Sequence, residues 1–181
     1  MATKSNKGVK VFTFFSGNTN ELQKIHVDFI DTLRNRIESL REVSTVDESD
    51  IVLVLCPIVS RTGTDIEAAV KNVKDNTDSK LVVLVVLHHT FDPEKTVPDS
   101  SRCVNRTDIL TVDCLFNEDK GLLKCQKNSE AFDQAMNWLK QGRNTAVKIY
   151  PRQNNGQIPK GSEDAPIPSK GSAERRSCAI M

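Results

Sequence analysis

The sequence predicts an α/β domain that is built around a mainly parallel β-sheet. Residues 51–58, IVLVLCPI, are apolar throughout rather than alternating, as expected of a parallel strand that helices cover on both faces. Residues 22–40 instead carry apolar side chains at steps of three and four, which is the spacing of one helix face. Strands and helices of this kind alternate along the chain, and this order favours right-handed crossovers with helices on both faces of the sheet.

Each element follows from its local pattern. β-branched, aromatic and aliphatic residues concentrate in five segments, which we predict to be strands: residues 9–15, 42–46, 51–58, 80–89 and 109–116. Apolar residues at helical spacing predict three helices: residues 22–40, a segment that Thr64 opens and that ends near residue 74, and a closing helix marked by Phe132, Ala135, Met136 and Leu139. A long loop, residues 90–107, precedes the last strand.

We expect a single three-layer sandwich with the strand order 2-1-3-4-5, which is the flavodoxin-like arrangement. In open sheets of this kind, ligands bind beyond the carboxyl ends of the strands. The candidate functional loops are therefore the four segments predicted at that edge: residues 16–20, 57–63, 88–105 and 117–121.

The composition indicates one globular domain with an additional polar segment. The chain has 181 residues, of which 38% are hydrophobic and 27% are charged. We expect a flexible N-terminus at residues 1–8, the α/β domain at residues 9–142, and a disordered tail at residues 143–181, which is rich in Pro, Gly, Ser and charge. From Lys140 onward eight basic residues outnumber three acidic ones, whereas the preceding part has an acidic excess. The net charge of +1 implies no general attraction to nucleic acid.

The predicted compartment is the cytoplasm. The N-terminal residues lack the apolar stretch of a signal peptide, and no run of about 18 apolar residues predicts a transmembrane helix. Five cysteines are scattered without C-x-x-C spacing, which argues against a disulfide framework or a zinc site. We expect no bound metal.

The loop after the first predicted strand resembles the phosphate loop of flavodoxins, T-x-T-G-N-T. The match covers Ser16, Gly17, Asn18 and Thr19. Phe14 replaces the first hydroxyl residue of that pattern. The resemblance implies a site for a small anion or a nucleotide at the positive end of a helix dipole. The alternative is a capping box, in which Asn18 caps the helix and Glu21 returns the hydrogen bond. Because the later loops lack a pair of aromatic residues to stack a flavin, we expect no flavin or other cofactor.

Residues 61–70, RTGTDIEAAV, resemble the G-T-x-x-E pattern of nucleoside deoxyribosyltransferases. That resemblance implies that Gly63 and Thr64 bind a ligand and that Glu67 attacks the anomeric carbon of a ribosyl group to form a glycosyl ester. The sequence departs from the pattern at Arg61, where the family has an acid. The alternative is again a capping box, formed by Thr64 and Glu67.

A histidine pair, His88 and His89, ends a strand at the predicted ligand edge. Adjacent strand residues point to opposite faces of a sheet, so the two rarely share a metal. His88 is a candidate for ligand binding or proton transfer, and a loop or capping role is the alternative. Asp113 lies inside an apolar strand and must either find a hydrogen-bond donor, which Arg102 or Arg106 could supply, or lie near the strand end.

Over residues 9–139 the chain resembles a set of uncharacterised vertebrate proteins with a C-terminal CaaX box. The stretches that carry this resemblance are CPIVSR, VVLHHTFDP and LTVDCLF. The resemblance implies a single compact domain and no particular activity.

The last four residues, CAIM, fit the C-a-a-X prenylation signal, with Cys178 as the acceptor and a final Met that selects farnesyl. A single lipid chain binds membranes weakly, with an association constant on the order of 10⁴ M⁻¹, so a second signal is needed. Lys170, Arg175 and Arg176 would supply it by attraction to anionic lipid. We therefore expect an interaction or adaptor domain that a prenylated tail tethers reversibly to cytosolic membrane faces. The alternative is a nucleoside or dinucleotide hydrolase or transferase with Glu67 as its nucleophile.

Overall fold

The computed structural model describes residues 8–74, 77 and 80–149. These residues form a mainly parallel sheet with helices, which confirms the predicted α/β class. The sheet order is β2-β1-β3-β4-β5-β6, and its strands are β1 (Lys10–Phe15), β2 (Arg41–Glu42), β3 (Ile51–Pro57), β4 (Leu81–His89), β5 (Ile109–Asn117) and β6 (Gly121–Leu122). Neighbouring strands from β2 to β5 are parallel, and β6 is antiparallel to β5.

The prediction of five strands was wrong, because it missed β6 and lengthened β2. A two-residue strand is too short to show any periodicity in the sequence. Tertiary contacts create β6: Leu122 donates its backbone N–H to Asp28 Oδ2 on the first helix, at 3.3 Å. Gly121 has a φ of +78°, and a Cβ there would clash with the same Asp28 oxygen. The left-handed backbone conformation and this close contact favour glycine at the position.

The helices are α1 (Thr19–Arg36), α2 (Thr62–Lys74) and α3 (Gln126–Ile149), and a short 3₁₀ helix, η1 (Ser100–Cys103), interrupts the long loop that the sequence predicted. Helix α3 runs on to Ile149, so the domain boundary expected at residue 142 falls inside a helix, and residues 143–149 are helical rather than part of a disordered tail. The N-terminal residues 1–7 and the tail from residue 150 lie outside the described residues.

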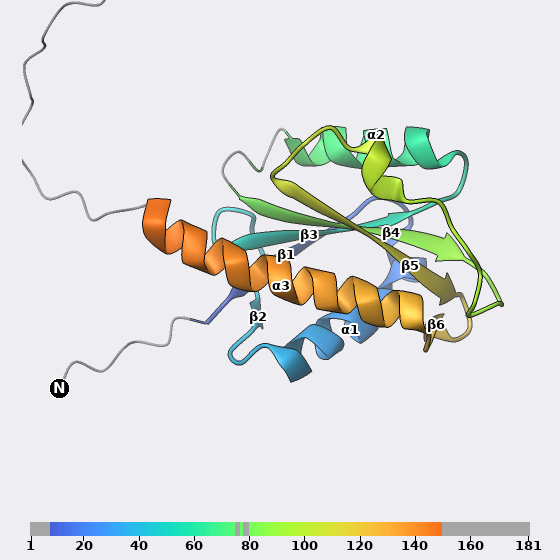
Figure 1. Ribbon diagram of the computed structural model, residues 1–181, viewed down its shortest axis with the longest axis horizontal. Helices are drawn as coiled ribbons and strands as arrows, with labels where there is room; N and C mark the ends of the chain where they lie inside the picture. Colours follow the sequence, from blue (N-terminus) through green and yellow to red (C-terminus); the bar gives the residue numbers. More distant parts are fainter. Residues whose placement is uncertain (1–7, 75–76, 78–79, 150–181) are drawn as a thin grey trace, which may run out of the picture. The chain divides into compact units, whose positions relative to one another are not determined.

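Apolar side chains form a cluster on each face of the sheet. Helices α1 and α3 cover one face, where the rings of Phe29 and Phe132 lie 4.6 Å apart between centroids. Helix α2 covers the other face through Ile66, Ala69 and Val73. Figure 1 shows α1 and α3 below the sheet, and α2 and η1 above it. The helical spacing of apolar residues in α1 and α2 thus corresponds to burial against the sheet.

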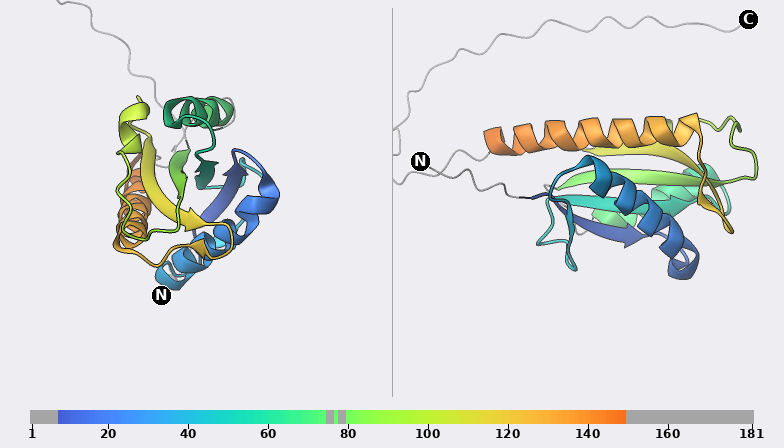
Figure 2. Two further views of the ribbon diagram at one scale, coloured as in Figure 1. Left: turned by 90° about the vertical axis from the view of Figure 1, so that its right-hand side faces the viewer. Right: turned by 90° about the horizontal axis from the view of Figure 1, so that it is seen from below.

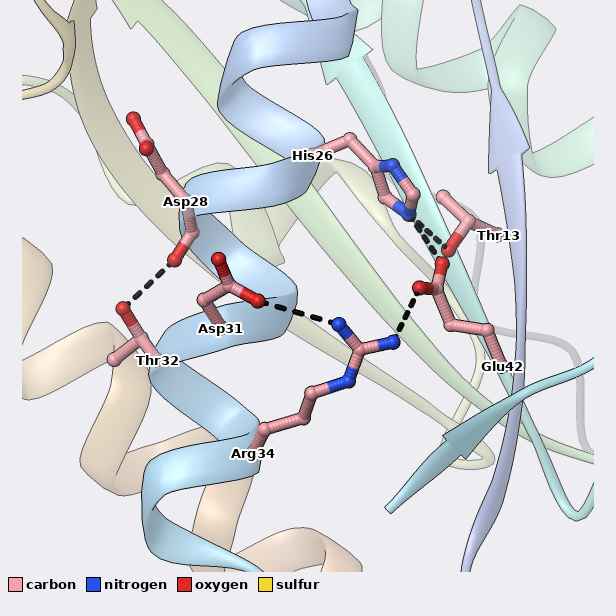
Figure 3. A network of polar contacts seen from close by, with 7 residues as sticks. All are labelled: Thr13, His26, Asp28, Asp31, Thr32, Arg34 and Glu42. Atoms are coloured by element: carbon pink, nitrogen blue, oxygen red, sulfur yellow. Dashed lines mark hydrogen bonds and ion pairs between the residues drawn. The ribbon is translucent and has the colours of Figure 1, made fainter.

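A polar network fixes α1 to the edge of the sheet (Figure 3). His26 Nε2 on α1 lies 2.8 Å from Glu42 Oε1 on β2 and 3.1 Å from Thr13 Oγ1 on β1. The other oxygen of Glu42 accepts a hydrogen bond from Arg34 Nη2 at 2.8 Å. Arg34 also pairs with Asp31 at 3.2 Å. This network explains how a strand as short as β2 keeps its place at the edge.

Candidate functional site

The loop after β1 is built as a helix cap. Asn18 Oδ1 accepts the backbone N–H of Asn20 at 3.2 Å, and Asn18 Nδ2 donates to Glu21 Oε1 at 2.9 Å. The predicted cap is therefore present, but Glu21 returns its contact to the side-chain amide of Asn18 rather than to a backbone N–H. Gly17 has a φ of +138°, and a Cβ there would lie 3.2 Å from Pro57. Ser16 already donates its N–H to Leu55 O at 2.9 Å, so this N–H is not available to an anion.

The start of α2 differs from the capping box that we predicted for Thr64 and Glu67. The helix begins at Thr62, so Thr64 lies inside it. Asp65 holds the preceding loop instead: its Oδ2 accepts the backbone N–H groups of Val59 and Ser60, each at 2.9 Å, and its Oδ1 accepts the Ser60 hydroxyl at 2.8 Å. Partial burial acts to raise the pKa of Asp65, but the hydrogen bonds from Ser60 and Val59 outweigh it and hold this pKa below its ordinary value.

We expect Asp65→Ala to destabilise the domain more than Glu67→Ala. Asp65→Ala removes three hydrogen bonds and should lower the free energy of unfolding by about 1–2 kcal/mol. Glu67 is exposed on α2, so Glu67→Ala should change stability by no more than about 0.5 kcal/mol. Urea unfolding of both variants measures the difference. Equal losses would mean that Glu67 has a structural role after all.

An open groove of about 730 Å³ lies between α2 and η1 and contains the second set of predicted site residues. Gly63, Thr64 and Glu67 line one side, and residues 102–105 line the other. Lys71 and Arg102 bring two cations to the same groove as the Glu67 carboxylate. This arrangement can attract a phosphate-bearing ligand while presenting one exposed carboxylate.

His88 is a partner of Asp113, in place of the two candidate arginines. Its Nε2 lies 2.8 Å from Asp113 Oδ1, and the two side chains are 9% and 8% exposed. The backbone N–H of Ser100 donates to Asp113 Oδ2 at 3.1 Å. Arg106 instead pairs with Asp108, two residues later in the chain, and Arg102 Nε lies 3.8 Å from Asp99 Oδ2. Neither arginine is the partner, because the register of β4 against β5 places His88 beside Asp113, and the predicted strand order does not specify that register.

Burial acts to raise the pKa of Asp113, but the hydrogen bonds from His88 and Ser100 outweigh it and keep this pKa below its ordinary value. Asp113 is therefore a carboxylate at neutral pH. The Ser100 hydroxyl is buried and has no hydrogen-bond partner among the residues that the structure describes. Because Ser100 and His88 both bond to the aspartate, the three do not form the serine–histidine relay of a hydrolase. The geometry fits a buried structural bond between β4, β5 and η1.

The neighbouring His89 points to the opposite side of the sheet, as predicted for adjacent strand residues. Its ring packs edge-on against Phe91 and Phe116, with centroid distances of 5.6 Å and 5.4 Å. In the part of the chain that the structure describes, no group of three or more His, Cys, Asp or Glu side chains is placed to hold a metal ion.

A further groove, of about 460 Å³, was missed by sequence reasoning. It follows the outer edge of β5, between η1 and α3. Its lining consists of Asp99, Ser101, Ile109, Leu110, Thr111, Val112, Asp113, Lys127, Glu130, Ala131 and Gln134. The predicted strand order places residues 109–116 at one edge of the sheet, but it does not indicate which segments flank the outer side of that strand. Only the packing of η1 and α3 on opposite faces reveals the groove.

The predicted site residues therefore lie in separate places. Gly63, Thr64 and Glu67 share the α2 groove, whereas residues 16–18 cap α1 and His88 bonds to Asp113. The side chain of Thr19, and all of Lys170, Arg175, Arg176 and Cys178, lie outside the described residues. No protein-family model matches the sequence, and no curated protein matches it significantly. Any functional assignment must therefore rest on the chemistry of these sites and of the C-terminal motif.

Proposed function

We propose that this protein is an interaction domain that a prenylated C-terminal tail tethers reversibly to cytosolic membrane faces. The observation that carries the proposal is the C-terminal CAIM sequence. It places an acceptor thiol, two aliphatic residues and a methionine in the order that a farnesyltransferase recognises. The segment between Ile149 and Cys178 is rich in Pro, Gly and Ser, which suits a linker that must reach a transferase and then a membrane.

The basic residues near the acceptor supply the second membrane signal in this proposal. Lys170, Arg175 and Arg176 would each contribute about 1 kcal/mol near an anionic leaflet, and Glu174 would subtract from that sum. Among the described residues, no helix has the length and apolar character that crossing a bilayer requires. A lipid group with a basic cluster is the means of membrane attachment that the sequence itself offers.

The domain offers surfaces for a partner at the carboxyl ends of the strands. Val59 is 85% exposed in the loop after β3, and Phe91 is 75% exposed in the loop after β4. Since β3 and β4 are parallel neighbours, both loops leave the same edge of the sheet. Exposed apolar side chains at an edge of this kind favour contact with another protein. The proposal includes a flavodoxin-like, three-layer arrangement, which the strand order and the two apolar clusters support.

The test of the lipid is the intact mass of the full chain after expression in animal cells. We expect a mass increase that corresponds to one farnesyl group, with or without loss of the last three residues and carboxyl methylation. Cys178→Ser should remove the increase. An unmodified parent chain would contradict the proposal at its first step.

The second candidate function is cleavage of a glycosidic bond with Glu67 as the nucleophile. The observation that favours it is the α2 groove, where Glu67 lies with Lys71 and Arg102, two cations that suit the phosphate of a nucleotide. The experiment incubates the full chain with a panel of nucleosides and dinucleotides and measures release of the free base. Glu67→Gln, which keeps the shape of the side chain, should abolish any release. Absence of turnover across the panel would exclude this candidate.

A further inference from the structure

The edge of β5 that faces away from β4 is only partly covered. β6 pairs with its carboxyl end, at Phe116 and Asn117, and within residues 8–74, 77 and 80–149 no strand pairs with the earlier part of that edge. Successive residues of a parallel strand direct their backbone groups alternately to the two sides. The backbone of Leu115 is directed away from β4, because its carbonyl accepts the N–H of Leu123 at 3.0 Å. The backbone groups of Asp113 and Thr111, two and four residues earlier, are therefore directed outward as well.

At one point of this edge, an asparagine side chain makes the pair of hydrogen bonds that the backbone of a neighbouring strand would make. Asn128 Oδ1 accepts the N–H of Leu115 at 2.7 Å, and Asn128 Nδ2 donates to the Leu115 carbonyl at 2.8 Å. Asn128 is buried on α3, so this pair of bonds is a built feature of the edge. Thr111 and Asp113 are the next residues that present the same donor and acceptor, and no equivalent side chain bonds to them within the described part of the chain.

The groove of about 460 Å³ lies along this stretch of the edge. The β5 residues 109–113 form its floor, Ser101 of η1 and the preceding Asp99 form one wall, and Lys127 and Glu130 of α3 form the other. Figure 2 shows β5 between η1 and α3 in the left-hand view, in agreement with Figure 1. The backbone N–H and C=O groups of Thr111 and Asp113 lie on the side of β5 that no strand pairs with in the described part of the chain, and a bound extended backbone would satisfy them.

We propose that this groove binds an extended peptide segment of another protein, which adds a strand to the edge of β5 and places a lysine or arginine over Asp99. The proposal deepens the proposed function, because it names the surface and the chemistry with which an interaction domain would hold its partner. Backbone hydrogen bonds to Thr111 and Asp113 would supply affinity, and alternate side chains of the peptide would supply specificity.

The charge preference follows from the two walls. On the η1 side the charged groups are the carboxylates of Asp99 and Asp113, and the nearest cation is Arg102, whose Nε lies 3.8 Å from Asp99 Oδ2. The Arg102 side chain is 85% exposed, so solvent strongly screens its attraction to Asp99. On the α3 side, Lys127 and Glu130 oppose each other in sign. A basic residue is therefore favoured where the peptide faces η1, and an uncharged residue where it faces α3.

The experiment uses the isotope-labelled full chain, produced without the lipid, and nuclear magnetic resonance. The probes are two short capped peptides of alternating threonine and valine, one with a central lysine and one with a central glutamate. We expect the lysine peptide to shift the amide resonances of Thr111 and Asp113 and to slow their hydrogen exchange. It should bind roughly fivefold more tightly than the glutamate peptide. Asp99→Asn, which keeps the acceptor that caps η1 but removes its charge, should abolish that preference.

A proline variant tests the strand addition itself. Thr111→Pro removes one outward N–H and leaves the hydrogen bonds between β4 and β5 intact, because prolines are tolerated on the open side of an edge strand. Binding of the lysine peptide should fall below detection, whereas the matched control Thr111→Val should retain it. If Thr111→Pro fails to fold, Asp99→Lys tests the proposal instead. This substitution reverses the charge of an exposed side chain, so the chain should then bind the glutamate peptide more tightly than the lysine peptide.

Several outcomes would overturn the proposal. One is a set of shifts that avoids β5, and another is equal binding of both peptides to the parent chain. Protection of the Thr111 and Asp113 amides before any peptide is added would assign the edge to the protein's own tail. Concentration-dependent dimers that Thr111→Pro abolishes would assign it to a second copy. Because these measurements use the unmodified chain, they do not depend on whether Cys178 is prenylated.

Discussion

Replacing Cys178 by serine should release the protein from membranes almost completely. The substitution removes the proposed lipid acceptor of the C-a-a-X signal but leaves Lys170, Arg175 and Arg176 in place. Three cations without a lipid chain bind weakly, because salt at physiological concentration screens them over about 8 Å. Fractionation of cells that express the parent and the variant measures the effect. A variant that stays on membranes as firmly as the parent would refute the prenyl anchor.

The basic residues should modulate this association without determining it. The double substitution Arg175→Glu and Arg176→Glu keeps the acceptor and reverses two charges, so it should weaken membrane binding and its response to salt. Deletion of residues 150–181 should abolish binding while the domain stays folded, because α3 ends at Ile149 and the buried apolar clusters lie before that point. Thermal unfolding of the shortened chain provides the control for folding.

Substitution of Asp113 by alanine should cause a large loss of stability. It leaves the buried His88 ring and the Ser100 N–H without their acceptor, which should cost about 2–4 kcal/mol of unfolding free energy. Asp99→Asn is the matched control, because it alters an exposed carboxylate that caps the adjacent η1 and keeps an acceptor there, so it should leave the unfolding free energy nearly unchanged. Urea unfolding at neutral pH measures both. Similar losses of unfolding free energy in the two variants would show that the hydrogen bond between His88 and Asp113 contributes little to stability.

The stabilisation by Asp113 should depend on pH in a defined direction. Because its pKa in the folded state lies below the ordinary value, the unfolded chain binds a proton more readily than the folded one. The contribution is therefore complete above the unfolded pKa of about 3.9 and is lost as the pH falls through the lower folded value. The difference in unfolding free energy between the parent and Asp113→Ala should stay constant from pH 7 to about 5 and narrow below about 4. A difference that widens in acid would contradict this assignment.

The candidate site could be predicted only in part. The Asn18 cap was among the alternatives, since a cap depends on residues close together in the chain. The start of α2 was predicted wrongly, because the pattern G-T-x-x-E fits a helix that begins at Thr64. In the structure the helix begins at Thr62, and Asp65 holds the preceding loop. The partner of Asp113 also escaped prediction, because it comes from a strand 25 residues away in the sequence.

The sequence by itself determined the α/β class, the positions of the long strands and the faces that the helices bury. These properties follow from local periodicity, and a run such as residues 51–58 excludes a solvated face. It also contains CAIM, a linear stretch that fits the C-a-a-X pattern on which the proposed function rests. Only the tertiary structure decided that His88 would meet Asp113, that Asp28 would bring β6 to the sheet, and that the outer edge of β5 would remain open between η1 and α3. The predicted strand order already made β4 and β5 neighbours and placed β5 at an edge. The sequence left open the register between these strands and the packing of η1, α3 and β6 around that edge, because both are set by the whole domain rather than by any one segment.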